Sequence, residues 1–365
     1  MKKLLVLFSG LLILASCTQE EGYKIVINMD SLGGTELKLQ QRVAGDFVVI
    51  DSVVLDSLGQ GVMSGKVSTE EMMYIGIPGS RRGIPVFMGN YKYAIDGTPE
   101  DPMVEAKKGP QVAYNEYSVP KKELENQRSE IMKKYRDGSD QGLSEEEMKP
   151  ILDEYEAIYA KIDKLDSVYI AEHPSSIVSV YLLRNSFYNY NDEQLADKLD
   201  ALDESLHSST YYVFLADHLE KMKSVKIGNK YVDFELPDPD GNMVRLSDLA
   251  ENGVLLIDFW ASWCGPCRRA NPGVVELYNE FHNKGFDILG VSLDRTREDW
   301  LEAIATDGLV WHHVSDLKFW GCEAAGLYAV SAIPHTVLLD QNGVIVARNL
   351  EKDELRAKLL ELLGE

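Results

Sequence analysis

The sequence predicts a C-terminal α/β domain that follows a small all-β domain and a helical segment, and three patterns support this fold class. Short strand-like runs separated by Gly, Asp and Asn fill residues 23–110. Apolar residues recur at three- and four-residue steps within 120–225, which is typical of amphipathic helices. Residues 226–365 contain continuously apolar strands next to helical patterns, as parallel sheets do. A chain of 365 residues is long enough for two or three domains.

The first residues have the composition of an export signal. Within residues 1–16, two lysines follow Met1 and precede an apolar stretch that is too short to span a bilayer comfortably. The small residues directly before Cys17 resemble the lipobox of bacterial lipoproteins. We therefore expect a lipoprotein signal peptide over 1–16 and lipid attached to the sulfur of Cys17. The alternative is an ordinary secretory signal that leaves Cys17 as a free thiol, and both place the protein outside the cytoplasm.

The residues after Cys17 bear on which surface the protein occupies. Residues 18–21 end in two glutamates and resemble the surface-export signal of lipoproteins in some anaerobic Gram-negative bacteria. We expect a lipid-anchored protein of the cell envelope that faces the periplasm or lies on the outer surface.

The all-β prediction rests on short runs rich in Val, Ile and Tyr, bounded by turn residues. We expect a small β-sandwich or barrel, with strands at 24–28, 36–39, 47–55, 74–77, 86–88 and 92–95. From about residue 121 the period changes from two residues to that of a helix. We expect helices over 151–169, 176–185, 193–205 and 211–222, with their tyrosines and isoleucines in the core.

The residues before 226 carry no recognisable chemistry. They contain no charged catalytic cluster, phosphate-binding loop or metal-ligand spacing. We therefore interpret residues 23–225 as a module for targeting, dimerisation or presentation of a substrate.

A pair of cysteines at the start of a predicted helix carries the chemistry of the chain. Residues 254–260 are expected to form a buried strand and 268–283 a helix, so Cys264 and Cys267 lie at a strand-to-helix turn. The unpaired N–H groups of a helix N-terminus favour an anion and lower the pKa of a thiol placed there. We expect Cys264 to be the nucleophile that attacks a disulfide, and Cys267 to resolve the resulting mixed disulfide.

Two further residues complete the predicted site. Asp258 interrupts the apolar strand, and a carboxyl buried there has a raised pKa and could take the proton of Cys267. Pro334 opens a later strand, and we expect its bond to Ile333 to be cis. Extended peptides would then pair with the backbone of Ile333 by strand addition. Trp263, Gly265, Pro266 and Ile333 are the expected lining of the substrate groove.

These residues resemble the thioredoxin superfamily. The run Trp263-Cys264-Gly265-Pro266-Cys267, with Asp258 before it and Ile333-Pro334 after it, is the basis of that likeness. Residues 232–249 resemble the opening hairpin of the TlpA-like and ResA-like thiol-disulfide oxidoreductases, which are tethered to membranes. The resemblance implies a thioredoxin fold over 226–365, a redox pair at Cys264 and Cys267, a buried acid that assists Cys267, and a cis-proline at Pro334. The β-domain also looks like one that often precedes thioredoxin modules in Bacteroides-type lipoproteins.

The resemblance also implies a direction and partners. Gly-Pro between the cysteines is similar to the reducing thioredoxins, whose reduction potential is about −270 mV, so we expect reduction of protein disulfides. An exported dithiol is separated from cytosolic reductants. We therefore expect disulfide-bearing envelope proteins as substrates and a membrane-embedded protein as electron donor, with no cofactor. A formal charge of −22 excludes nucleic acid as a partner and suits a lipid tether better than a basic membrane patch.

Four alternatives compete with this interpretation. The two cysteines could be half of a zinc site, but the sequence has no second cysteine pair to complete it. The adjacent His312 and His313 would point to opposite faces of a strand and could not bind one ion together. A structural disulfide explains neither the strand-to-helix position nor the distant Ile-Pro. A peroxiredoxin-like thiol peroxidase usually has threonine where this chain has Ala261. A redox-sensing envelope lipoprotein that binds a ligand through its β-domain is the non-enzymatic alternative.

Three residues near the motif raise separate expectations. His335 stands where the family usually has threonine, and we expect a solvated histidine at a strand edge, with titration near neutral pH as the alternative. Arg268 and Arg269 would add positive charge that favours the Cys264 thiolate. Cys322 is expected to be a small, partly buried residue at a helix start, with a regulatory thiol as the alternative.

Overall fold

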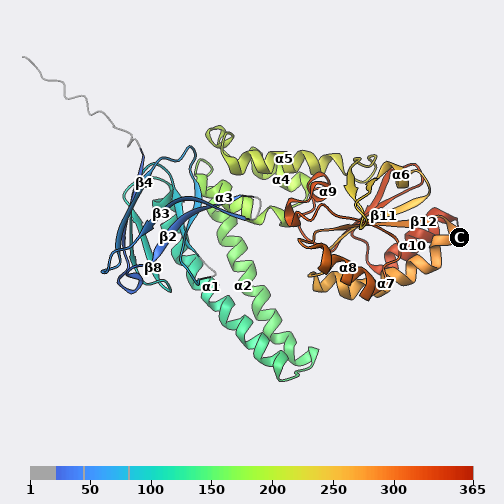
Figure 1. Ribbon diagram of the computed structural model, residues 1–365, viewed down its shortest axis with the longest axis horizontal. Helices are drawn as coiled ribbons and strands as arrows, with labels where there is room; N and C mark the ends of the chain where they lie inside the picture. The colour runs from blue at the N-terminus through green and yellow to red at the C-terminus, as the bar shows by residue number, and fades with distance from the viewer. Residues whose placement is uncertain (1–21, 44–45, 81–82, 365) are drawn as a thin grey trace, which may run out of the picture. The chain divides into compact units, whose positions relative to one another are not determined.

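The computed structural model describes residues 22–43, 46–80 and 83–364 and divides the chain into two compact units (Figure 1). Among these residues, the first unit comprises 22–40, 49–80 and 83–119, and the second comprises 41–43, 46–48 and 120–364. The predicted signal peptide and Cys17 lie outside the described residues. Across the described ranges, no helix is both long enough and apolar enough to cross a bilayer.

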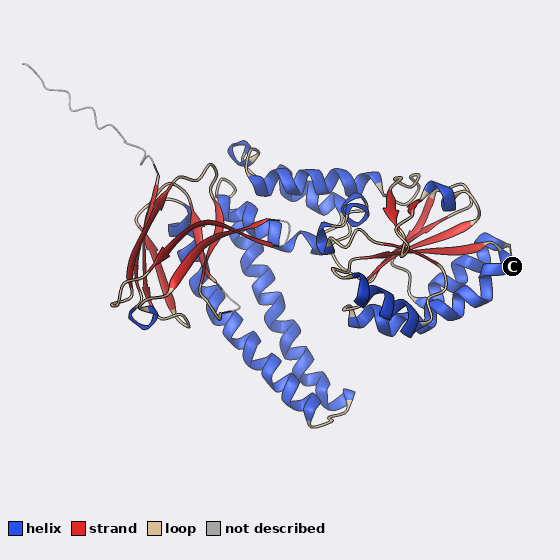
Figure 2. Ribbon diagram, in the orientation of Figure 1, coloured by secondary structure: helices blue, strands red, loops and turns tan. Residues whose placement is uncertain are grey.

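The first unit, together with residues 41–43 and 46–48, forms two four-stranded sheets, drawn in red in Figure 2. Buried and exposed side chains alternate along residues 23–28, and the buried ones belong to a core that includes Ile25, Leu37 and Ile95. One sheet has the order β4 (Gln60–Gly65), β1 (Tyr23–Asn28), β7 (Lys92–Gly97), β8 (Pro102–Ala106), and the other β3 (Asp46–Val54), β2 (Glu36–Val43), β5 (Glu71–Gly76), β6 (Ile84–Met88).

Five helices follow the sheets: α1 (Pro110–Asp140), α2 (Glu145–Glu172), α3 (Ile177–Ser186), α4 (Asp192–Asp200) and α5 (Thr210–Ser224). The predicted apolar stripe is confirmed, because Ile158 and Ile162 of α2 pack with Ile131 of α1. The largest differences from the predicted boundaries are at α1, α2 and α4, and α2 begins at Glu145 rather than at 151. Helix α1 begins before Pro120 and continues through it, and α4 ends at Asp200. The helices from residue 120 onward share one compact unit with the C-terminal domain.

The C-terminal domain is built on a five-stranded sheet, as the resemblance implied. Its order is β13 (His312–Val314), β12 (Phe286–Ser292), β11 (Val254–Trp260), β14 (His335–Leu339), β15 (Ile345–Arg348). Strands β11, β12 and β13 are parallel, whereas β14 runs antiparallel to β11. A hairpin of β9 (Glu235–Pro237) and β10 (Met243–Arg245), followed by α6 (Ser247–Ala250), precedes the sheet.

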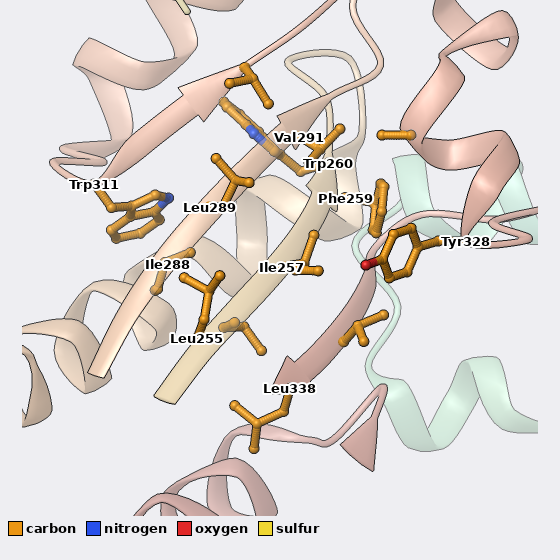
Figure 3. Packing of buried hydrophobic residues seen from close by; sticks show 14 of the residues in the cluster. Leu255, Ile257, Phe259, Trp260, Ile288, Leu289, Val291, Trp311, Tyr328 and Leu338 are labelled. Carbon is orange, nitrogen blue, oxygen red and sulfur yellow. The ribbon is translucent and has the colours of Figure 1, made fainter. Parts of the chain in front are cut away.

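Helices cover both faces of this sheet. Helices α7 (Gly265–Phe281), α8 (Arg297–Asp307) and α10 (Lys352–Leu363) lie together on one side, and α9 (Glu323–Leu327) lies on the other (Figure 1). All seven residues of β11 are buried, which explains their nearly unbroken apolar sequence. Figure 3 shows Ile257 and Phe259 of this strand packed beside Tyr328, whose ring lies 5.7 Å from that of Phe259. The buried central strand is therefore a rigid support for the residues that follow it.

Candidate active site

The two cysteines lie where β11 passes into α7 and form a disulfide. Their Cα atoms are 5.3 Å apart, within the range that a disulfide spans without movement of the backbone. Cys264 is the N-cap residue of α7, and its Sγ accepts a hydrogen bond from the backbone N–H of Cys267 at 3.1 Å. The helix begins at Gly265, earlier than predicted, because a sulfur cap and Pro266 in the first turn are both compatible with a helix start.

This position favours a thiolate at Cys264 once the disulfide is reduced. The backbone N–H of Cys267 donates to the sulfur, and the helix dipole adds positive potential there. Both cysteines are nearly buried, with 4% of Cys264 and 2% of Cys267 exposed, whereas Trp263 beside them is 47% exposed. The Cys264 sulfur is therefore shielded, whereas the residue directly before it presents its ring to solvent.

The prediction of added positive charge is wrong for Arg268, whose charge is paired, and stays a prediction for Arg269. Its guanidinium donates to both carboxylate oxygens of Asp307 in α8, at 2.5 and 2.8 Å. This pairing lowers the pKa of Asp307 and raises the pKa of Arg268. The side chain of Asn271 donates to the same carboxylate at 2.6 Å. The charge of Arg268 is thus largely compensated, so the N-terminus of α7 stabilises the Cys264 thiolate more than Arg268 does.

Asp258 is buried in the middle of β11, as predicted. Only 6% of the residue is exposed. It pairs with Gly290 of β12 on one side and with Thr336 of β14 on the other. Loss of hydration on burial raises the pKa of its carboxyl group to about 7. A carboxyl with that pKa exchanges its proton near neutral pH, which is the property required of a general acid or base.

A pocket of about 470 Å³ brings three of the predicted site residues together. Asp258, Cys267 and Pro334 all line it, from β11, α7 and the segment before β14. Leu256, Val274, Leu277, Leu350 and Leu355 supply apolar walls, and Arg269, Thr336, Asn349, Glu351 and Lys352 supply polar groups. Water in this pocket would connect the Asp258 carboxyl group and Cys267 to solvent, so a proton has a route in and out.

The rest of the predicted groove lies around the disulfide. The bond between Ile333 and Pro334 is cis, as predicted, and Pro334 is exposed while Ile333 packs partly against the core. Gly265 and Pro266 are exposed on the first turn of α7.

The sequence did not single out the aromatic residues that surround Trp263. The Trp263 ring lies 5.1 Å from that of Phe319 and 6.2 Å from that of Trp320. Phe319 has a φ of 56°, which is uncommon for a residue other than glycine. The run Phe319-Trp320 was visible in the sequence, but its proximity to Trp263 depends on the fold. These rings extend the apolar surface next to Cys264.

His335 is not a solvated histidine, so this expectation is wrong. Arg348 of β15 donates to its Nε2 at 2.9 Å and also to the backbone carbonyl of Tyr328. A guanidinium cannot accept a hydrogen bond, so the imidazole proton must be on Nδ1. Burial, and then the charge of Arg348, lower the pKa of His335 to about 3. The alternative of titration near neutral pH is excluded for the same reason.

We expect His335→Thr to leave the shape of the pH–rate profile unchanged between pH 5 and 8. A histidine with a pKa of about 3 is neutral across that range, so its loss removes no titration. Any change in rate should therefore be the same at every pH. Disulfide-exchange rates of the two proteins at several pH values test this. A step near pH 6.5 in the wild-type profile that the variant lacks would contradict the assignment.

Cys322 is a buried structural residue, in agreement with the prediction. It is the N-cap residue of α9, only 2% of it is exposed, and burial raises the pKa of its thiol to about 11. A thiol of that kind is protonated and inaccessible, so it is a poor nucleophile. In the described part of the chain, no three His, Cys, Asp or Glu side chains are grouped as a metal site.

Comparison with known proteins agrees with this geometry. The profile of the AhpC/TSA family matches residues 227–348. A thiol-disulfide oxidoreductase ResA of Bacillus cereus is 34% identical over 143 residues, which are 38% of this chain and 75% of that relative. ResA of Geobacillus thermodenitrificans is 30% identical over 151 residues, 40% of this chain and 84% of that protein.

Solved structures match the same part of the chain. A thiol-disulfide oxidoreductase from Bacteroides fragilis NCTC 9343 is 39% identical and covers 37% of this chain and 99% of its own, with a TM-score of 0.35. The thioredoxin domain of a thiol-disulfide oxidoreductase from Bacteroides vulgatus is 35% identical. The match covers 38% of this chain and 99% of that one, also with a TM-score of 0.35. From the sequence identity to ResA and the dithiol at the start of α7, the chain belongs to the thiol-disulfide oxidoreductases of the thioredoxin superfamily, through a C-terminal domain of the AhpC/TSA family.

Proposed function

We propose that this protein reduces disulfide bonds in other proteins of the cell envelope, through the dithiol of Cys264 and Cys267. The observation that supports this most strongly is the position of Cys264 as the N-cap of α7, with Cys267 one turn on beside a buried carboxyl group. A cysteine at the N-terminus of a helix has a stabilised thiolate, so it is both a good nucleophile and a good leaving group in disulfide exchange. The buried acid can remove the proton that Cys267 holds in the reduced protein.

The exchange proceeds in two balanced steps. The Cys264 thiolate attacks one sulfur of a partner disulfide, forming a mixed disulfide and releasing the other partner sulfur as a thiolate that takes a proton. Asp258 then accepts the proton of Cys267, whose thiolate attacks the Cys264 sulfur. The second partner sulfur leaves and is protonated, and Cys264 and Cys267 are left joined as the disulfide. Two electrons pass to the partner in each cycle.

The partner chain would lie across Trp263, Gly265, Pro266 and Ile333. An extended segment pairing with the backbone of Ile333 binds by strand addition, with little dependence on its own sequence. Trp263 is exposed and borders Cys264, so it can cover the reacting sulfurs from water. We propose this groove as the reason that many different envelope proteins could serve as substrates.

The cellular setting is proposed from the sequence. Lipid on Cys17 would tether the protein to a membrane, facing the periplasm or the outside of the cell. Cys264 and Cys267 must be reduced again after each cycle, and outside the cytoplasm this requires a membrane-embedded electron-donor protein. Residues 23–225 would present substrates, target the protein or support self-association.

Reduction of insulin by dithiothreitol tests the proposed activity. Catalytic amounts of the purified protein should accelerate the appearance of insoluble insulin chains, because the dithiol exchanges with disulfides faster than the small thiol does. Cys264→Ser should show no acceleration, and Cys322→Ser should match the wild type because Cys322 is buried. A wild-type protein that does not accelerate the reaction would contradict the proposal.

A further inference from the structure

The peptide before the dithiol is held by hydrogen bonds from two directions. Ser262 donates from its backbone N–H to both carboxylate oxygens of Asp294, at 3.2 and 3.1 Å, and from its Oγ at 2.5 Å. Its backbone carbonyl accepts from Nη1 of Arg268 at 3.2 Å. Every hydrogen-bonding group of Ser262 is thus engaged, one residue before Trp263 and two before Cys264.

Both residues that hold Ser262 are themselves fixed. Asp294 follows β12, is 1% exposed, and accepts a further hydrogen bond from the Oγ of Ser292 at 2.7 Å. Its own backbone N–H donates to the same Oγ at 3.0 Å. Arg268 is fixed by its two bonds to Asp307. The turn is therefore attached to the end of β12 and, through Arg268, to α8.

These contacts do not reach either sulfur, so any effect on exchange acts through the position of the turn. In the oxidised protein the S–S bond itself keeps Cys264 beside Cys267. After reduction that covalent restraint is gone, and the position of Cys264 depends on its cap and on the turn before it. A fixed turn keeps the two thiols at a high effective concentration relative to each other. A high effective concentration makes the disulfide more stable and the dithiol a stronger reductant.

We propose that Asp294 is a positioning residue for disulfide exchange, acting through Ser262 to hold Cys264 beside Cys267 in the reduced protein. This inference rests on the proposed function, because a protein that reduces disulfides must itself form a stable disulfide. Asp294 is the residue to which Ser262 donates from both its N–H and its Oγ. An amide at position 294 keeps one acceptor oxygen and places a donor where the second oxygen accepts, so part of this hold is lost.

Equilibrium of the purified protein with glutathione tests the inference, because it yields the effective concentration of the two thiols directly. We expect Asp294→Asn and Ser262→Ala each to lower it about tenfold, a rise of about 30 mV in reduction potential. Ser262→Ala changes no charge, so it separates the position of the turn from the charge of Asp294. The double variant should lose no more than the larger single loss, since both act through one contact.

A matched variant and a second readout exclude a general loss of stability. Asp299→Asn makes the same change in an exposed carboxylate of α8 and should leave the glutathione equilibrium unchanged. Thermal unfolding identifies any variant that is only destabilised. If Asp294→Asn does not fold, Ser262→Ala by itself still tests the inference. Folded Asp294→Asn and Ser262→Ala with wild-type potentials would overturn the inference. The wild-type potential and the insulin assay are independent of this comparison, so failure of the proposed function would be recognised separately.

Discussion

Cys267→Ser is expected to leave the protein joined to its partners through Cys264 as stable mixed disulfides. Without the second thiol, nothing in the site attacks the Cys264 sulfur after the first step. Cys264→Ser should form no such adducts, because the capped nucleophile is missing. Insulin turnover should fall at least about a thousandfold in both variants, since the two sulfurs act as one unit. Acid-quenched membranes, separated without reductant and analysed by mass spectrometry, reveal the adducts.

Two controls make the trapping experiment specific. The adducts should disappear on addition of dithiothreitol, and Cys267→Ser combined with Cys322→Ser should give the same adducts, because Cys322 is buried and its pKa is raised to about 11. Absence of adducts with Cys267→Ser would contradict the enzymatic interpretation. It would favour the alternative of an envelope lipoprotein that binds a ligand and only senses redox state through its dithiol.

Asp258→Asn is expected to have the second largest effect, slowing turnover by about 10² to 10⁴-fold. An amide cannot take the proton of Cys267, so resolution of the mixed disulfide becomes slow. The pKa of the Asp258 carboxyl group is about 7, so its basic form increases as pH rises from 6 to 8. The wild-type rate should rise through that range, and the variant should lack this dependence. Stopped-flow measurement of mixed-disulfide resolution at several pH values checks both.

Stability of the same variant gives an independent test with a defined sign. The pKa of Asp258 is raised on folding from 3.8 to about 7, so the carboxyl stabilises the fold fully below pH 4 and this contribution is lost as pH rises through 7. The loss amounts to roughly 4 kcal/mol. The free energy of unfolding of Asp258→Asn, relative to that of the wild type, should therefore rise by this amount between pH 4 and pH 8. Urea denaturation of both proteins at the two pH values measures the difference.

Asp287→Asn, a half-buried carboxylate on β12, provides the control for both Asp258 experiments. It should neither remove the pH dependence of resolution nor change the pH dependence of stability in the way Asp258→Asn does. An Asp258→Asn protein with wild-type resolution kinetics and a constant stability difference across pH would show that Asp258 is neither the proton acceptor nor a buried acid.

Much of the site could be predicted because its chemistry is encoded locally. The run of apolar residues before Cys264 fixes a buried strand, and Asp258 is visible as its one carboxyl. A cysteine pair spaced by two residues after such a strand defines the helix start. Pro334 is distant in sequence, yet it precedes an apolar strand that pairs with β11, so the sheet itself brings it to the dithiol.

The parts that could not be predicted depend on partners far apart in the sequence. The charge of Arg268 is compensated by Asp307, and His335 is held neutral by Arg348, a contact that only the pairing of β14 with β15 creates. Ser262 is an ordinary polar residue until the end of β12 places Asp294 against it.

Boundary errors have a similar origin, since tertiary structure outweighed weak local patterns. Strand β4 contains two glycines and few apolar residues, and β8 begins at a proline, so neither was predicted. Helix α1 begins at Pro110 and continues through Pro120, close to where we expected the helical segment to begin.

The reduction potential of the Cys264/Cys267 pair, measured against a series of glutathione or dithiothreitol mixtures, tests the central claim most directly. A reductase requires a disulfide that is stable relative to those of its substrates. We predict a potential below about −230 mV, which would direct the search toward a membrane-embedded electron donor. A potential above about −180 mV would contradict the account, because a pair of that kind oxidises or isomerises protein thiols rather than reducing disulfides.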